Sequence, residues 1–235
     1  MNTFSDSLLV AYHLILTLDS ALWEIVLRSL TVSGLSILFS APLAIILGAL
    51  IASTDFKLKP FCELALNAML AMPSVVLGLL VYLLLSRSGP LGHLGWLFSI
   101  KAMVLAQALL ILPLMIALAN GAVKSPEMDV QEQLKAMGAG PLARALVLIW
   151  DFREAMLLVM VAGFSRAIAE VGAVMIVGGN IDGFTRVMTT AIALETSKGD
   201  LALALALGLV LLGLVFLLHI LMALFKSWHP ALVKD

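Results

Sequence analysis

Arg166 and Glu170 are the residues best placed to act on a ligand, because they are charges inside the apolar run 155–181. Their four-residue spacing puts both side chains on one face of a helix, where they could pair. Each charge near the centre of a membrane span costs about 2.5–3.5 kcal/mol, so both must face protein or water. Two interpretations stay open and are compatible. The pair could lock the helices together, or the arginine could attract an oxyanion in a translocation pathway while Glu170 holds it in place.

The end of the same run, Gly178-Gly179-Asn180, is the second candidate site. Glycine permits a sharp turn with positive φ, which any helix exit could require. Backbone amides freed at such a turn could instead contact an oxyanion. These three residues are therefore assigned, with Arg166 and Glu170, to a possible translocation pathway.

The stretch 130–150 is a charge-bearing interruption in a chain that is otherwise mostly apolar. Good helix formers run up to a break of two glycines and a proline, and a second short helix is expected after it. Both helices carry apolar ridges, and charged residues, Arg144 among them, are expected to keep the segment exposed to water. This pattern predicts a surface on which a soluble partner docks. The residues assigned to docking are Glu132, Lys135, Ala136, Gly138, Gly140 and Pro141.

Several functional classes lack their residues in this sequence. No Gly-Lys dipeptide occurs, so a phosphate-cradling loop cannot form and energy must come from a partner. The four histidines are too scattered to make a metal site, and no nucleophile with a base is visible, so we expect neither a catalytic nor a metal centre. A net charge of −1 without charged blocks argues against nucleic acid as a partner.

Composition decides the fold class. Hydrophobic residues make up 62% of the chain and charged residues 12%, which predicts an all-α integral membrane protein. A span needs about 20 apolar residues. Five spans are expected in a single transmembrane domain, residues 1–235, preceded by an N-terminal interfacial helix near residues 8–18. The predicted spans are 29–54, 64–86, 102–123, 155–181 and 201–225, with a kink at Pro73.

Loop charges predict the orientation, because lysine and arginine are enriched on the cytoplasmic side. With the docking loop in the cytoplasm, the N-terminus is outside and the C-terminus inside. Segment 189–194 is then expected as a helix at the outer interface or as a plain surface helix. The inside set is Lys57, Lys59, Lys124, Lys135, Arg144, Arg153, Lys226 and Lys234, and the outside set is Arg28, Arg87, Lys101, Arg186 and Lys198.

Two motifs resemble a known family. The pattern of Glu132, five intervening residues, Gly138, small residues and Pro141 resembles the cytoplasmic coupling loop of ABC importer permeases. The segment Gly163-Phe164-Ser165-Arg166-Ala167-Ile168-Ala169-Glu170-Val171-Gly172-Ala173 is similar to the segment that follows this loop in molybdate, sulfate and tungstate permeases, and its continuation is most like the tungstate group.

The resemblance implies a permease subunit, not itself an enzyme, that imports an oxyanion across the bacterial inner membrane. Tungstate is the expected cargo, with molybdate or sulfate as alternatives. The implied partners are a second copy of the chain, cytoplasmic ATP-binding subunits that hold ATP and Mg, membrane lipid, and an extracytoplasmic oxyanion-binding protein. This chain would carry no cofactor. A secondary transporter is the remaining alternative, although no inverted pair of broken helices is evident in the sequence.

Overall fold

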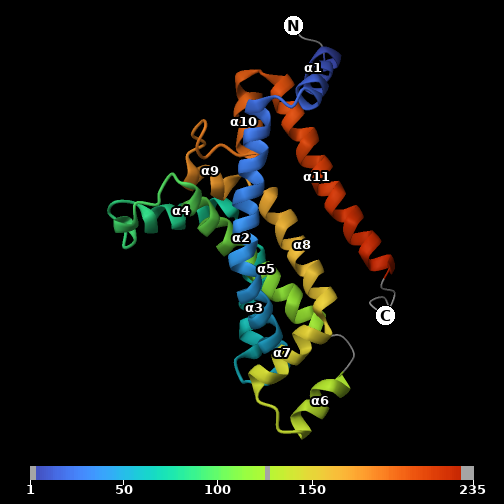
Figure 1. Ribbon diagram of the computed structural model, residues 1–235. Coiled ribbons are helices and arrows are strands. Elements are labelled where there is room, and N and C mark those ends of the chain that lie inside the picture. The colour runs from blue at the N-terminus through green and yellow to red at the C-terminus, as the bar shows by residue number, and fades with distance from the viewer. Residues whose placement is uncertain (1–3, 125–127, 229–235) are drawn as a thin grey trace. The chain divides into compact units, whose positions relative to one another are not determined.

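The computed structural model describes residues 4–124 and 128–228, and every regular element in these residues is helical (Figure 1). Lys234, counted above on the cytoplasmic side, lies outside them. The all-α fold class is confirmed. The helices are α1 (Phe4–Leu16), α2 (Ser20–Ser53), α3 (Lys59–Leu70), α4 (Ser74–Leu85), η1 (Gly92–Leu94), α5 (Ile100–Val123), α6 (Met128–Ala136), α7 (Pro141–Asp151), α8 (Arg153–Ile168), α9 (Gly172–Gly178), α10 (Met188–Lys198) and α11 (Leu201–Trp228).

Three helices of the described chain, α2, α5 and α11, are each long and apolar enough to cross a membrane. Two further spans arise if each bent pair, α3 with α4 and α8 with α9, crosses as one unit, which gives up to five. The five expected spans therefore overlap three single helices and two bent helix pairs. The role of α1 at a membrane interface stays a prediction.

The two broken spans have different origins. The axis bends by 98° between α3 and α4, at the kink expected from Pro73, whose extended backbone (φ −61°, ψ 129°) precedes α4. The 60° bend between α8 and α9 corrects the prediction of one continuous span over 155–181.

Helix α2 begins at Ser20, nine residues before the predicted start. The Asp19 carboxylate accepts a hydrogen bond from the Leu22 amide at 3.0 Å and so caps the helix. Glu24 and Arg28 form an ion pair one turn apart within it. The predicted span begins after these two charged residues. Because they pair with each other on one face of the helix, α2 includes them.

The chain forms two compact units. Unit 1 comprises Met1–Ser36, Pro73–Gln107 and Ser165–Leu221, and unit 2 comprises Ile37–Met72, Ala108–Phe164 and Met222–Asp235. In unit 1, α4 packs along α9 (Figure 1), so closely that a Cβ on Gly78 would lie 2.8 Å from the Ala173 Cα. In unit 2, Gly48 allows α2 to approach α5, where a Cβ would lie 2.6 Å from that of Ala119.

Helix α10 confirms the helix expected at 189–194 and belongs to unit 1. Thr190 and Ala191 are fully buried, and Met188 donates its amide to the Ser29 hydroxyl of α2 at 2.7 Å. One face of α10 thus packs inside the unit, and its position at the outer membrane interface stays a prediction.

Candidate functional site

Glu170 occupies the break between α8 and α9 and holds it together. Its side chain is only 3% exposed. One carboxylate oxygen accepts a hydrogen bond from Arg166 at 2.7 Å, and the other accepts the amide of Ala173, in the first turn of α9, at 3.1 Å. A carboxylate in that position caps the free amides of a helix start. Glu170 thus serves as ion-pair partner and helix cap at once.

The breaks of the two bent spans meet in unit 1. The hydroxyl of Ser74, the first residue of α4, hydrogen-bonds the Glu170 side chain. Across the same junction a Cβ on Gly172 would lie 2.9 Å from the Ser74 hydroxyl and 2.7 Å from a Val75 methyl carbon. Glycine at 172 is required by this close approach. The start of α4 and the start of α9 are therefore linked through one buried carboxylate.

Side chains from two other helices hydrogen-bond backbone carbonyls at the α8–α9 break. Gln107 of α5 donates its amide nitrogen to the Ala167 carbonyl at 2.9 Å, and the Thr189 hydroxyl of α10 donates to the Glu170 carbonyl at 2.7 Å. The Ser36 hydroxyl of α2 lies 3.1 Å from the Gln107 side-chain oxygen. Broken helices in a membrane depend on such compensation, since no water replaces the lost bonds there.

Arg166 differs from Glu170 in its access to the surface of unit 1. Its side chain is 42% exposed, and its Nη1 atom donates to Glu170. A guanidinium carries five N–H donors in a planar fork that suits an oxyanion. The contacts of Glu170 support the structural interpretation of the pair. The exposed part of Arg166 also leaves room for an anion to approach its guanidinium group.

The Gly178-Gly179-Asn180 turn is a helix exit with left-handed backbone, at φ 71° for Gly179 and 49° for Asn180. Several of its backbone N–H and C=O groups already form hydrogen bonds with neighbouring residues. The Gly179 amide donates to Met175, and the Thr185 hydroxyl donates to the Gly178 carbonyl at 2.6 Å while accepting the Ile181 amide at 2.9 Å. These contacts favour the helix-exit interpretation, and the role of the turn in a pathway stays a prediction.

The predicted docking segment forms two helices with the expected bend in unit 2. Helix α6 ends at Ala136, Gly138 has a left-handed φ of 75°, Gly140 is the extended cap of α7, and Pro141 is its first residue. Glu132, Lys135 and Ala136 are exposed. Large apolar side chains stand beside these polar ones on the surface: Met137 (81% exposed), Leu142 (56%) and Trp150 (70%).

An ion pair ties α6 to the connection between α2 and α3. Lys135 lies 2.8 Å from Asp55, and this hydrogen bond is the main reason that the pKa of Asp55 is lowered from its ordinary value of 3.8. Arg144 also lowers this pKa through its charge. However, Arg144 is 9% exposed and lies with Ala145 and Leu148 on the buried face of α7, so the expectation that it keeps the segment wet is wrong. Its long stem packs like an apolar side chain.

Sequence reasoning found Arg166 and Glu170 but missed the residues that position them. Ser74, Gln107 and Thr189 are uncharged polar residues within apolar runs, and nothing in their spacing indicates a common target. Asp55 was likewise missed, because its partner Lys135 is 80 residues away. Within the described residues no group of three histidine, cysteine or acidic side chains could hold a metal ion.

Three helices long and apolar enough to cross a membrane, together with two bent helix pairs that meet at a buried ion pair, define a multi-pass membrane protein and are typical of transporters. No protein-family model matches the chain. The tungstate uptake permease TupB of Peptoclostridium acidaminophilum is 39% identical over 93% of this chain and 96% of its own length. The TupB permease of Campylobacter jejuni is 43% identical over 70% and 69%.

A probable anion ABC transporter permease of Haloferax volcanii is 38% identical over 86% of this chain and 89% of its own. The chain therefore belongs to the family of ABC transporter permeases that contains the tungstate uptake permeases. Molybdenum and sulfate transport permeases match at lower identity.

Proposed function

We propose that this chain is the permease of an ABC importer for tungstate. The observation that carries the proposal is the similarity along nearly the whole chain to a tungstate uptake permease. The broken spans that meet at Glu170 agree with it, because discontinuous helices near the middle of a membrane are common at transport sites.

The permease works with partners that supply energy and substrate. Two copies of the chain enclose the pathway, and a cytoplasmic ATPase binds ATP and Mg and docks on α6 and α7. The exposed Met137, Leu142 and Trp150 support this docking, because apolar anchors within a polar rim are typical of protein interfaces. An extracytoplasmic binding protein delivers the anion, and the docking loop and the C-terminus face the cytoplasm while the N-terminus faces outward.

Arg166 provides the positive charge of the pathway. An oxyanion that enters a membrane loses hydration, and a guanidinium offers charge-assisted hydrogen bonds in exchange. Glu170 limits the strength of that attraction, since its carboxylate already neutralises much of the arginine. A site of this kind can pass an anion along without trapping it.

Molybdate or sulfate is the alternative cargo, supported by the more distant matches to permeases for those anions. Uptake of radiolabelled tungstate by cells that express the complete transporter separates the candidates. Unlabelled tungstate should compete at the lowest concentration and sulfate at the highest. If sulfate or molybdate competes better than tungstate itself, the proposed substrate is wrong.

A further inference from the structure

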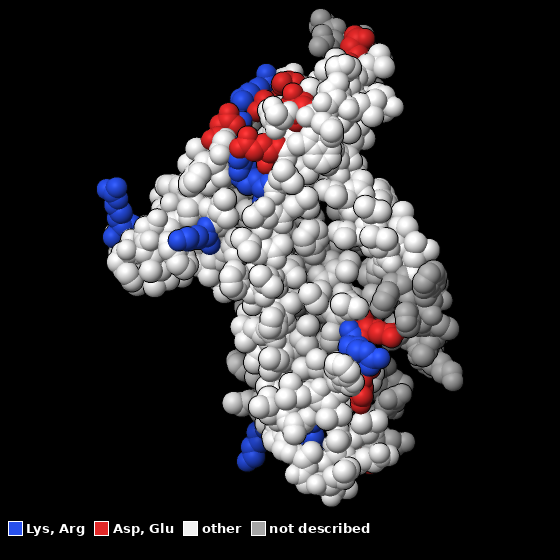
Figure 2. All heavy atoms as spheres, in the orientation of Figure 1, with Lys and Arg blue, Asp and Glu red and all other residues white. Residues whose placement is uncertain are grey.

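The connection between α4 and α5, with the first turn of α5, carries positive charge that forms no ion pair with an acidic side chain of the described residues. Residues 64–126 contain Arg87, Lys101 and Lys124 but no aspartate or glutamate. None of the ion pairs found among the described residues involves Arg87 or Lys101. Figure 2 shows basic side chains over this end of unit 1 with no acidic one beside them. Within the described residues these two cations are thus free to attract an anion.

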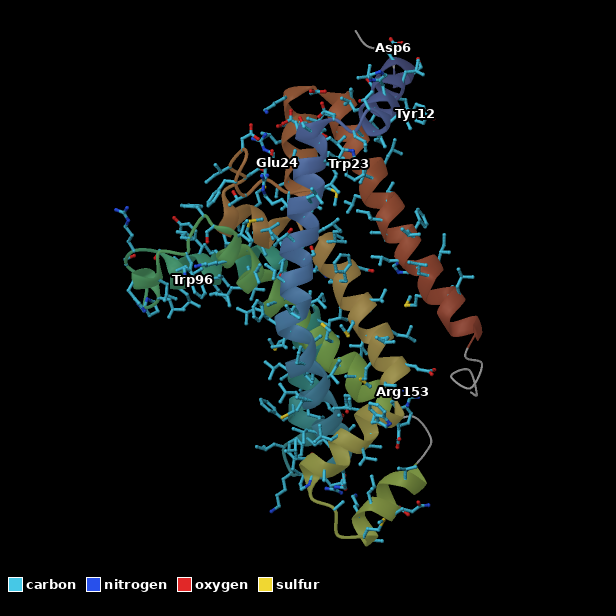
Figure 3. All side chains as sticks on the ribbon, viewed as in Figure 1. Asp6, Tyr12, Trp23, Glu24, Trp96 and Arg153 are labelled. Atoms are coloured by element: carbon cyan, nitrogen blue, oxygen red, sulfur yellow. The ribbon has the colours of Figure 1, made fainter. Side chains whose placement is uncertain are left out.

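A pocket of about 280 Å³ lies next to this charge, and Lys101 forms part of its wall. The Lys101 ammonium nitrogen lies 5.8 Å from the centroid of the Trp96 ring, which Figure 3 places in the α4–α5 connection. The Ser99 hydroxyl is already engaged, donating to the Trp96 carbonyl at 2.5 Å. Leu94, Ile100 and Phe184 complete an otherwise apolar lining. The pocket thus combines one ammonium group with aromatic and aliphatic walls.

The pocket lies at the depth of a membrane interface. Its residues lead directly into α5, which begins at Ile100 and has 24 residues. At about 1.5 Å per residue this helix is about 36 Å long, enough to cross a hydrocarbon layer of about 30 Å. The first turn of α5 therefore meets the headgroup region of one leaflet. Tryptophan and lysine are the residues expected at that depth.

We propose that this pocket binds an anionic phospholipid of that leaflet. Lys101 contacts the headgroup phosphate, and Trp96 and Phe184 contact the glycerol and the first carbons of the acyl chains. The charge of Lys101 favours an anion, and the exposed apolar surface of Leu94 (38%) and Phe184 (51%) favours an anion that carries hydrocarbon. A soluble oxyanion would leave that surface in water. The proposal is independent of which substrate the permease transports.

Native mass spectrometry of the purified, assembled transporter tests the proposal directly. The complex is titrated with phosphatidylglycerol or with phosphatidylcholine of the same acyl chains, and bound lipids are counted. Phosphatidylglycerol should bind more tightly to the wild type. Lys101→Gln should weaken that binding about fivefold, the effect of about one basic residue near an anionic membrane, and should leave phosphatidylcholine binding unchanged.

Two further variants control for folding and for bulk charge. Lys101→Arg keeps the charge and should retain the preference for phosphatidylglycerol. Lys57→Gln removes an equivalent exposed charge from the α2–α3 connection and should have no effect. Equal binding of the two lipids to the wild type, or equal effects of Lys101→Gln and Lys57→Gln, would overturn the proposal. So would a Lys101→Gln variant that binds phosphatidylglycerol normally and loses only its association with the extracytoplasmic binding protein.

Discussion

Replacing Arg166 with methionine should destabilise unit 1, and a second replacement at Glu170 should reverse most of the effect. In the single variant the buried Glu170 carboxylate keeps the Ala173 amide and Ser74 as partners but loses its charge-assisted bond to the arginine. Such a bond to a buried carboxylate is worth about 1.5–3 kcal/mol. For a chain of this size that corresponds to a fall in melting temperature of about 3–12 °C.

The double variant Arg166→Met with Glu170→Gln buries no charge. The glutamine side-chain oxygen can still accept the Ala173 amide, so the cap on α9 survives. Stability should return to within about 1 kcal/mol of the wild type, because removing both members of a buried pair is far less costly than removing one. Glu170→Ala, in contrast, removes the cap as well and should not be rescued by any change at Arg166.

Thermal unfolding and uptake should be measured on the same preparations of the single and double variants. If Arg166 also attracts the transported anion, the double variant should assemble and melt normally but transport poorly. A double variant as unstable as Arg166→Met would refute the structural reasoning. Full uptake by a well-assembled double variant would remove Arg166 from the pathway.

Three further predictions concern the docking segment and the topology. Gly138→Val should uncouple ATP hydrolysis from uptake without loss of assembly, because open space surrounds this residue but a β-branched side chain disfavours its φ of 75°; coupled turnover equal to wild type would contradict it. The ion pair with Lys135 lowers the pKa of Asp55 below 3.8. The stabilisation that this pair gives is therefore present above pH 3.8 and is lost as the pH falls through the lowered pKa of Asp55. Asp55→Asn should accordingly speed hydrogen exchange in α6 at pH 7, and this difference from wild type should shrink below pH 3.8; an effect independent of pH would exclude the pair as its cause. In a background without Cys62, an impermeant thiol reagent added to intact cells should label a cysteine at position 198 and not one at position 135; the reverse pattern would invert the topology.

The sequence predicts the elements that depend on local composition. Helices α5 and α11 follow long uncharged runs, and the break before α4 follows from Pro73. Helices α6 and α7 of the predicted docking segment, and the bend between them, follow from Gly138, Gly140 and Pro141. In each case the residues that determine the structure are close together in the chain.

Features that depend on distant partners could not be predicted in this way. No proline marks the break at 169–171, and Gly172 after it is required by a neighbour about 100 residues away. There Glu170 caps α9, while Gln107 and Thr189 hydrogen-bond nearby carbonyls. The burial of Arg144 is also decided by which face of α7 packs inside, and its charge gave the opposite indication. The Arg166 and Glu170 pair was predictable because its four-residue spacing is local.

Uptake of radiolabelled tungstate into proteoliposomes is the most direct test of the proposed function. The permease is reconstituted with its cytoplasmic ATPase, with ATP inside and the binding protein outside the vesicles. Uptake should require ATP and an active ATPase subunit, and should continue when ionophores abolish every ion gradient. Tungstate uptake that stops with the ionophores, or that proceeds with an inactivated ATPase, would contradict an ABC importer and indicate a secondary transporter.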